Sequence, residues 1–146
     1  MKIAFFDTKP YDRTFFDRYS TRFNADIKYY ETKLNIDTVS LAHGCDAVCV
    51  FVNDDIDAFV IEHLARLGVR VIALRCAGFN NIDLTALHEE PRIHAVRVPN
   101  YSPHAIAEHA IALLLTLIRK THKAYIRTRD FNFSLVGLSG VDLHGK

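Results

Sequence analysis

Short apolar runs alternate with segments of helical periodicity along most of the chain. Between residues 11 and 23, Phe15, Phe16, Tyr19 and Phe23 recur at spacings that place them on one face of a helix. Apolar runs too short to form helices separate such segments and predict strands. Strands are expected at 2–6, 26–30, 47–52, 69–74 and 93–98, and helices at 11–23, 38–42, 56–67, 83–89 and 103–125.

The strand predicted at 47–52 is apolar throughout, and the runs are interpreted as continuous apolar strands rather than alternating ones. Strands that are buried on both faces are typical of a parallel sheet covered by helices. The pattern therefore predicts an α/β fold, a flavodoxin-like five-stranded parallel sheet with helices on both faces. A long C-terminal helix follows, with Ser102 as its N-cap and Pro103 at its first position. We expect residues 1–100 to form one domain and residues 101–146 to hold the long helix and a connecting segment.

Composition and charge narrow the class of protein. A formal net charge of +1 gives no reason to expect a nucleic-acid partner. The chain has three cysteines, a small and odd number that argues against a disulfide framework, so a reducing, cytoplasmic environment is expected. The chain opens with a strand-like run rather than a signal peptide. The longest apolar run, 105–118, is interrupted by Glu108 and His109 and is too short to span a bilayer, so no membrane partner is expected.

The loop after the fourth predicted strand is the most unusual feature of the sequence. Ligands of open parallel sheets lie beyond the carboxyl ends of the strands. There, residues 75–81 (RCAGFNN) join a strand to a helix through one glycine and two asparagines. Such a loop can present backbone N–H groups to an anion, although an ordinary turn has the same composition. Cys76 lies in this loop, but the sequence defines no base that would make it a nucleophile.

Two other patterns suggest ligand binding and are rejected. Residues 140–146 (GVDLHGK) match a phosphate-binding loop as far as its lysine, but no strong strand precedes them and the required Ser or Thr is missing. His104 and His109 are five positions apart, about 140° around a helix. They cannot form a metal-binding pair of the kind that residues four apart provide, so no metal site is expected.

A phospho-receiver module is a rival fold of similar size. It needs acidic residues after strands one and three, which Asp7 and Asp54 or Asp55 could supply. It also needs Ser or Thr after strand four and Lys after strand five. The chain has Arg75 and Pro99 at those places, so this interpretation is rejected.

Longer stretches carry a more specific resemblance. Residues 51–55 (FVNDD), 73–84 (ALRCAGFNNIDL) and 98–110 (VPNYSPHAIAEHA) look like the D-isomer-specific 2-hydroxyacid dehydrogenases. The nearest branch is the fermentative D-lactate dehydrogenases, which residues 128–135 and 143–146 also resemble. The resemblance covers the whole chain in order.

The resemblance implies that other parts of the enzyme are encoded further along. In the family, the next residues would form the strand and G-x-G-x-x-G turn of an NAD-binding domain, and the catalytic Arg, Glu and His also lie there. No G-x-G-x-x-G occurs in these 146 residues. We therefore expect no catalytic and no cofactor-binding residue in this chain. NAD is expected as the cofactor of the complete enzyme and is not expected to bind this chain alone.

The resemblance also implies a substrate site. The backbone N–H groups of Ala77 and Gly78 would hold the substrate carboxylate, Tyr101 would hydrogen-bond the substrate, and Phe51 would limit its side chain. The substrate would be a small 2-keto or 2-hydroxy acid such as pyruvate or D-lactate. In the complete enzyme the reduced nicotinamide would deliver hydride to C2, the His would donate the proton, and the Arg would polarise the keto oxygen.

Two functions are consistent with these features. The chain is the substrate-binding portion of an NAD-dependent D-lactate dehydrogenase-like oxidoreductase, inactive alone, or it is a free-standing module that binds a small 2-oxo acid. A homo-oligomer is expected in either case, because the apolar residues of the long helix cover more than one side of it. These residues are Ile106, Ala110, Ile111, Leu113, Leu114, Leu115, Leu117 and Ile118.

Overall fold

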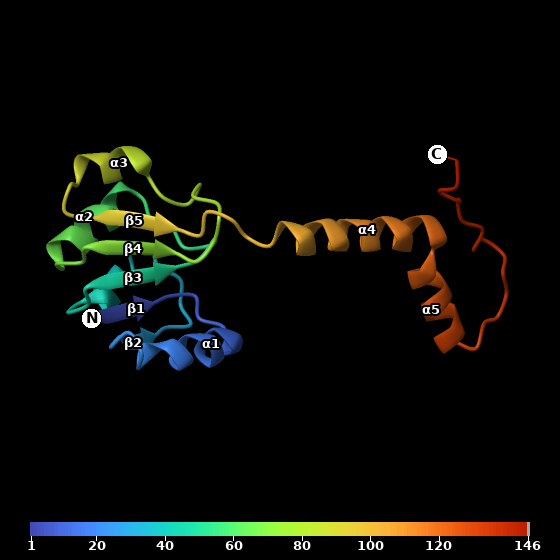
Figure 1. Ribbon diagram of the computed structural model, residues 1–146, viewed down its shortest axis with the longest axis horizontal. Coiled ribbons are helices and arrows are strands. Elements are labelled where there is room, and N and C mark those ends of the chain that lie inside the picture. The colour runs from blue at the N-terminus through green and yellow to red at the C-terminus, as the bar shows by residue number, and fades with distance from the viewer. Residues whose placement is uncertain (146) are drawn as a thin grey trace. The chain divides into compact units, whose positions relative to one another are not determined.

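The computed structural model describes residues 1–145, and the chain forms two compact units (Figure 1). The first unit comprises Met1–Tyr101, and the second begins at Ser102. The last residue of the stretches 140–146 and 143–146, Lys146, lies outside the described residues.

The first unit is built on a five-stranded parallel sheet. Its strands are β1 (Lys2–Phe5), β2 (Asp26–Tyr29), β3 (Ala47–Val50), β4 (Val71–Leu74) and β5 (His94–Arg97). They lie in the order β2-β1-β3-β4-β5, and every neighbouring pair is parallel. This is the flavodoxin-like arrangement that the apolar pattern predicts, so the expected fold class is confirmed.

The main core lies on one face of the sheet. Side chains alternate along a strand, so Ala4 and Phe6 point to one face while Ile3 and Phe5 point to the other. The first face is covered by the 3-10 helix η1 (Val39–Ala42), by α2 (Ala58–Arg66) and by α3 (Leu84–Glu89). Its fully buried side chains include Phe6, Val48, Val50, Val60, Ile61, Leu64 and Ile72.

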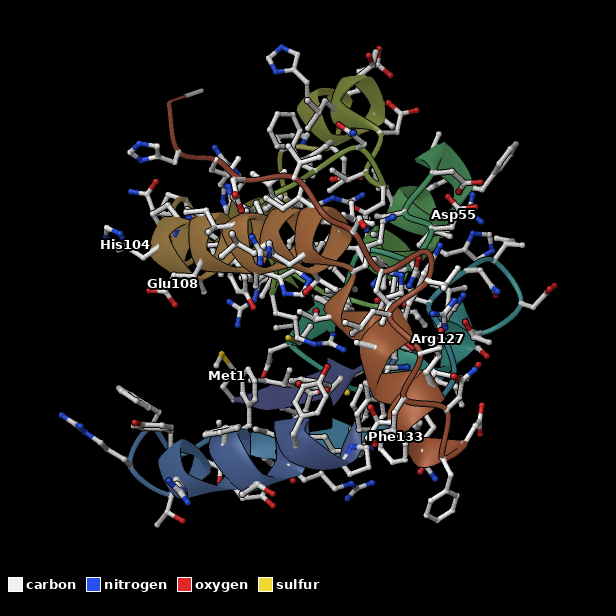
Figure 2. The ribbon with its side chains drawn as sticks, turned by 90° about the vertical axis from the view of Figure 1, so that its right-hand side faces the viewer. Met1, Asp55, His104, Glu108, Arg127 and Phe133 are labelled. Carbon is white, nitrogen blue, oxygen red and sulfur yellow. The ribbon has the colours of Figure 1, made fainter. Side chains whose placement is uncertain are left out.

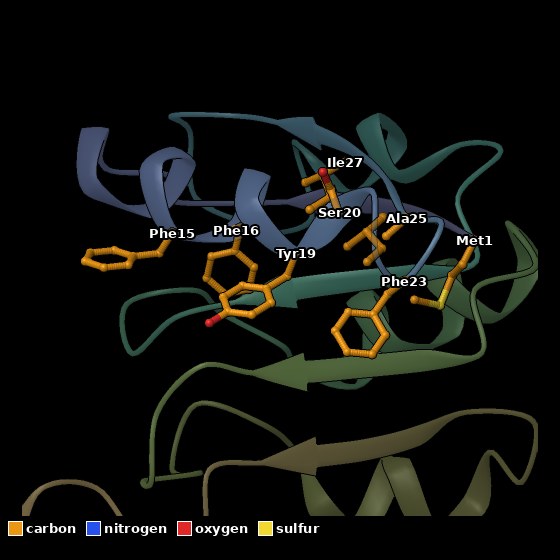
Figure 3. Close-up of a pocket in the computed structure, with 9 residues that line it drawn as sticks. Met1, Phe15, Phe16, Tyr19, Ser20, Phe23, Ala25 and Ile27 are labelled. Carbon is orange, nitrogen blue, oxygen red and sulfur yellow. The ribbon is translucent and has the colours of Figure 1, made fainter.

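The opposite face is covered in part by α1 (Pro10–Ser20), which packs the ring of Phe16 on that of Phe5 at 4.8 Å between centroids. Beside it lies an apolar hollow of about 440 Å³ (Figure 3), whose lining includes Phe15, Tyr19 and Phe23. These three aromatic side chains of the predicted helix face are more than half exposed. None of the side chains that line the hollow is charged.

The second unit corrects one prediction. The single helix expected over 103–125 is two helices, α4 (Pro103–Arg119) and α5 (Thr121–Arg129), separated by Lys120. Lys120 has φ +52°, a left-handed conformation that ends an α-helix. Pro103 occupies the start of α4 as predicted, but the Ser102 side chain makes no capping hydrogen bond. No helix within residues 1–145 is long and apolar enough to cross a membrane.

Residues 130–145 contain neither helix nor strand and fold back on the junction of α4 and α5. The Val141 N–H donates to the Ile118 carbonyl at 3.1 Å, and Lys120 Nζ donates to the Gly137 carbonyl at 3.2 Å. Arg127, labelled on α5 in Figure 2, donates to the carbonyls of Ser134 and Val136. The second unit therefore has its own fixed arrangement of two helices and a tail.

Candidate functional site

The carboxyl ends of all five strands meet at one edge of the first unit, because every strand runs in the same direction. Figure 1 shows this edge at the tips of the arrows, where the loops after β1, β3, β4 and β5 leave the sheet. This is the edge at which ligands of open α/β sheets bind. Phe51 directly follows β3, and Ala77 and Gly78 lie in the loop that follows β4.

The loop after β4 is held by its carbonyl groups. Arg97 Nη1 donates to the Ala77 carbonyl at 2.8 Å, and Cys76 Sγ donates to the Gly78 carbonyl at 3.3 Å. Within residues 1–145, neither the Ala77 N–H nor the Gly78 N–H donates to a protein acceptor. The loop therefore presents two backbone donors that a negatively charged ligand could use.

The space beside this loop is open. A hollow of about 330 Å³ is lined by Val52, Gly78, Asn80 and Asn81. A Cβ atom added to Gly78 would meet nothing within 4 Å, and its φ is not in the left-handed region. Neither the backbone conformation nor a close protein contact therefore requires glycine here. Because Gly78 has no side chain, a ligand in the hollow can approach the N–H groups of the loop.

Phe51 is half-buried, and both its backbone N–H and its backbone carbonyl are hydrogen-bonded by side chains. Its N–H donates to Oδ2 of Asp54, and its carbonyl accepts from Nδ2 of Asn81 at 2.9 Å. Asn81 also donates to the Asp54 carbonyl at 3.1 Å and lines the hollow beside Gly78. The structure thereby joins the loop of Phe51 to the loop of Gly78 through one side chain.

Asp54 is a buried carboxylate with a structural task. It is 2% exposed, and its Oδ1 accepts from the Leu34 N–H at 2.6 Å while its Oδ2 accepts from the Phe51 N–H. Burial raises the pKa of this carboxyl, and the two N–H groups act against that rise. Because both oxygens point to backbone donors, the carboxylate is not displayed to solvent as a phosphoacceptor would be.

We expect Asp54→Ala to lower the free energy of unfolding of the chain by about 3 kcal/mol, since two N–H groups lose their acceptor. Urea denaturation followed by circular dichroism measures the loss. Asp55→Ala is the matched control, because Asp55 is exposed and its side chain makes no hydrogen bond within residues 1–145. Equal stability of the two variants would contradict this structural role for Asp54.

Tyr101 is placed less decisively than the other three predicted site residues. It is the last residue of the first unit, is 65% exposed, and its hydroxyl makes no hydrogen bond within residues 1–145. No hydrogen bond in the described part of the chain joins it to Phe51, Ala77 or Gly78. Its role at the site stays a prediction from the resemblance.

Neither thiol near the site is set up as a nucleophile. Burial raises the pKa of the Cys76 thiol and raises that of Cys49 to about 12, so both stay protonated at neutral pH. Within residues 1–145 all three cysteines are free, and no group of three or more His, Cys, Asp or Glu side chains could hold a metal ion. This edge of the sheet therefore offers backbone N–H groups, which can donate hydrogen bonds to a ligand, beside the aromatic ring of Phe51.

The sequence alone does not reveal which residues hold Phe51 in place. The sequence presents Asp54 only as a possible phosphoacceptor, and Asn81 only as part of a polar loop. The available signal is a carboxylate or amide residue in the loop that follows an apolar strand, where its side chain can hydrogen-bond the backbone of the loops at that edge.

Comparison with known proteins identifies the family. Residues 3–134 match the family described as D-isomer specific 2-hydroxyacid dehydrogenase, catalytic domain. A 2-hydroxyacid dehydrogenase homolog of Haemophilus influenzae is 51% identical over all of this chain and 44% of its own length. The D-lactate dehydrogenase of Escherichia coli is 49% identical over the same shares.

Solved structures of similar fold belong to the same family. The apo-structure of the Escherichia coli D-lactate dehydrogenase superposes with a TM-score of 0.85 over 97% of this chain and 44% of that one. An NAD-complexed D-isomer specific 2-hydroxyacid dehydrogenase of Lactobacillus delbrueckii ssp. bulgaricus is 29% identical, with a TM-score of 0.72 over 92% of this chain and 40% of that one.

The chain belongs to the D-isomer-specific 2-hydroxyacid dehydrogenases, a family of oxidoreductases, and the part matched is the catalytic domain. The resemblance carried by residues 51–55, 73–84 and 98–110 is thus confirmed. The chain spans less than half the length of the relatives that it matches.

Proposed function

We propose that this chain supplies the substrate-binding portion of an NAD-dependent D-lactate dehydrogenase-like enzyme, which interconverts a small 2-keto acid such as pyruvate and the corresponding D-2-hydroxy acid. The observation that carries the proposal is the pair of backbone donors, Ala77 N–H and Gly78 N–H, without protein acceptors in residues 1–145 at the ligand edge of the sheet. Family membership supplies the class of substrate.

The chemistry of a 2-keto acid suits these donors. Its carboxylate is an anion with two oxygens, and hydrogen bonds from N–H groups to charged acceptors are stronger than those to neutral ones. The half-buried ring of Phe51 would lie against the apolar substituent on C2, and the Tyr101 hydroxyl would donate a hydrogen bond to the substrate. The chain's own contribution is to bind and orient the substrate rather than to move its proton or hydride.

The residues present do not fit NAD. The family's glycine-rich turn joins a strand to a helix and grips the pyrophosphate, whereas the strand-to-helix loop after β4 contains one glycine, Gly78, and those after β1 and β3 contain none. We therefore propose that NAD, which is present in the structure of one relative, binds a part of the full-length enzyme outside these residues.

The experiment is an assay of the full-length enzyme with NADH and a series of 2-keto acids. NADH should be oxidised when pyruvate is added, and chiral chromatography should find D-lactate as the product. A full-length enzyme that reduces no 2-keto acid, or that forms the L-isomer, would overturn the proposal.

Tyr101→Phe in the full-length enzyme should reduce kcat/KM for pyruvate by about five- to thirtyfold, the cost of one hydrogen bond of about 1–2 kcal/mol. The Kd for NADH should change little, since the hydroxyl is assigned to the substrate. Stopped-flow kinetics and fluorescence titration separate the two effects. Tyr19→Phe, a similarly exposed tyrosine on α1, is the control. A Tyr101→Phe enzyme with unaltered kcat/KM would remove this residue from the site.

A further inference from the structure

Against the Phe51 ring lies a largely buried arginine, Arg75, that the proposed function does not use. Arg75 directly follows β4, and its side chain is only 11% exposed. Its guanidinium lies 4.8 Å from the ring centre of Phe51 and 4.4 Å from that of Phe5. The Phe51 ring therefore rests on a planar cation that is itself sandwiched against a ring of β1.

Arg75 is fixed in turn by the loop and helix that follow β1. Its Nη2 donates to the Asp7 carbonyl at 2.6 Å and lies 3.6 Å from Oδ2 of Asp12 on α1. Asp7 has φ +48°, a left-handed conformation that costs a non-glycine residue free energy and that the surroundings must stabilise. The guanidinium thus links the carboxyl ends of β1, β3 and β4.

The neighbours of Phe51 lack such restraint. Val52 and Asn53 are exposed, and the Asn53 side chain makes no hydrogen bond within residues 1–145. Phe51, in contrast, has its N–H, its carbonyl and its ring each held, by Asp54, Asn81 and Arg75 respectively. So much fixation of a half-buried aromatic side chain at a ligand edge is typical of a residue whose position matters to the ligand.

We infer that Arg75, with Asp54 and Asn81, acts as a positioning residue that holds the Phe51 ring in one place and thereby sets the size of the 2-keto acid side chain that the site accepts. This inference rests on the proposed function. Arg75 acts through Phe51 and does not contact the substrate. A planar guanidinium is suited to this task because it stacks on a ring and donates hydrogen bonds in its own plane at the same time.

The test is a double-mutant cycle in the full-length enzyme. Arg75→Met keeps the length of the side chain and removes the planar cation, and it is made with Phe51 intact and again in a Phe51→Ala background. The readout is kcat/KM for a 2-keto acid with a four-carbon side chain divided by kcat/KM for pyruvate. Loss of structure alone would lower both constants together and leave this ratio unchanged. Arg70→Met is the matched control, since Arg70 lies just before β4, at its other end, and its side chain is 72% exposed.

With Phe51 intact, Arg75→Met should raise the ratio about fivefold, because a loosened ring can move aside for a longer substrate. In the Phe51→Ala background the same change should alter the ratio less than about twofold, because the ring through which Arg75 acts is gone. Arg70→Met should leave the ratio unchanged in both backgrounds.

An equal shift in both backgrounds, or no shift, would overturn the inference. A KM raised alike for every 2-keto acid in both backgrounds would do so too, because it would mean that Arg75 binds the carboxylate itself. If thermal melting shows that Arg75→Met does not fold, Arg75→Lys replaces it: this variant keeps the cation beside Asp12, lacks the planar fork and should still raise the ratio about twofold, and an unchanged ratio again overturns the inference. A wild-type enzyme that reduces none of the substrates would instead overturn the proposed function, and this inference with it.

Discussion

The 146-residue chain by itself is expected to oxidise no NADH in the presence of pyruvate. Its sequence contains no G-x-G-x-x-G turn, and the loops that connect β1, β3, β4 and β5 to the following α-helices contain a single glycine, Gly78. Without a site that binds NADH beside the substrate, hydride cannot be transferred, so the expected effect is the loss of all activity rather than a reduction.

Two measurements check this expectation. NADH oxidation is followed by absorbance with pyruvate in excess, with the full-length enzyme as the positive control. Thermal melting is followed with and without NAD, since a ligand present at about 100 times its Kd would add about 2.7 kcal/mol to the free energy of unfolding. Turnover by the chain alone, or a raised Tm in the presence of NAD, would show that these residues hold a cofactor site that the structure does not suggest.

The same chain is expected to self-associate at micromolar concentration through α4 and the tail. No residue of α4 is buried, and Ile111, Leu113, Leu114 and Leu117 are each between 47% and 66% exposed. Exposed apolar side chains gathered on one helix are typical of a surface that another chain covers. A contact burying about 400 Å² of it would contribute about 10 kcal/mol, enough to offset much of the entropy lost on association.

Light scattering and sedimentation velocity measure the association. Replacing Leu113 and Leu117, which are four residues apart on one face of α4, by Glu should shift the chain to a monomer. Phe59→Glu is the matched control, because this side chain of α2 is as exposed as Leu117 but belongs to the first unit. A monomeric wild-type chain, or equal association of the two variants, would contradict association through α4.

The apolar pattern predicts the positions of the strands well because each strand coincides with a short run rich in apolar residues, although β3 is buried throughout while every residue of the edge strand β5 is exposed. All five expected strands are present, and their helices follow in the expected order. The end of β3 is less predictable: the apolar run continues through Phe51 and Val52, but the strand stops at Val50. The chain turns there because Asp54 accepts the Phe51 N–H from its own loop, and a propensity for strands contains no such information.

The sequence around Lys120 gives no indication that the helix ends there and that α5 begins. Lys120 is a good helix former with neither glycine nor proline beside it. Its left-handed conformation is accompanied by contacts with residues far along the chain, the Gly137 carbonyl and the Val141 N–H that bonds to Ile118. Gly140 is part of this contact, since a Cβ there would clash with the Ile118 carbonyl. Such a junction depends on tertiary contacts that periodicity does not reveal.

Some features of the candidate site can likewise be predicted from the sequence, and others cannot. That Phe51, Ala77 and Gly78 come to one edge follows from the parallel order of the strands, which the sequence predicts. That Arg75 lies buried between two aromatic rings does not follow, because a charge after a strand usually faces solvent. Its position depends on Phe5, Phe51 and Asp12, which come from three different elements or loops.

The most direct test of the proposed substrate site is a crystal structure of the full-length enzyme with NADH and oxamate, an unreactive analogue of pyruvate. The oxamate carboxylate should accept hydrogen bonds from the Ala77 and Gly78 N–H groups, at about 2.9 Å between nitrogen and oxygen, with the Phe51 ring against the other end of the ligand. Oxamate bound elsewhere, with both N–H groups left without a ligand acceptor, would contradict the proposed site.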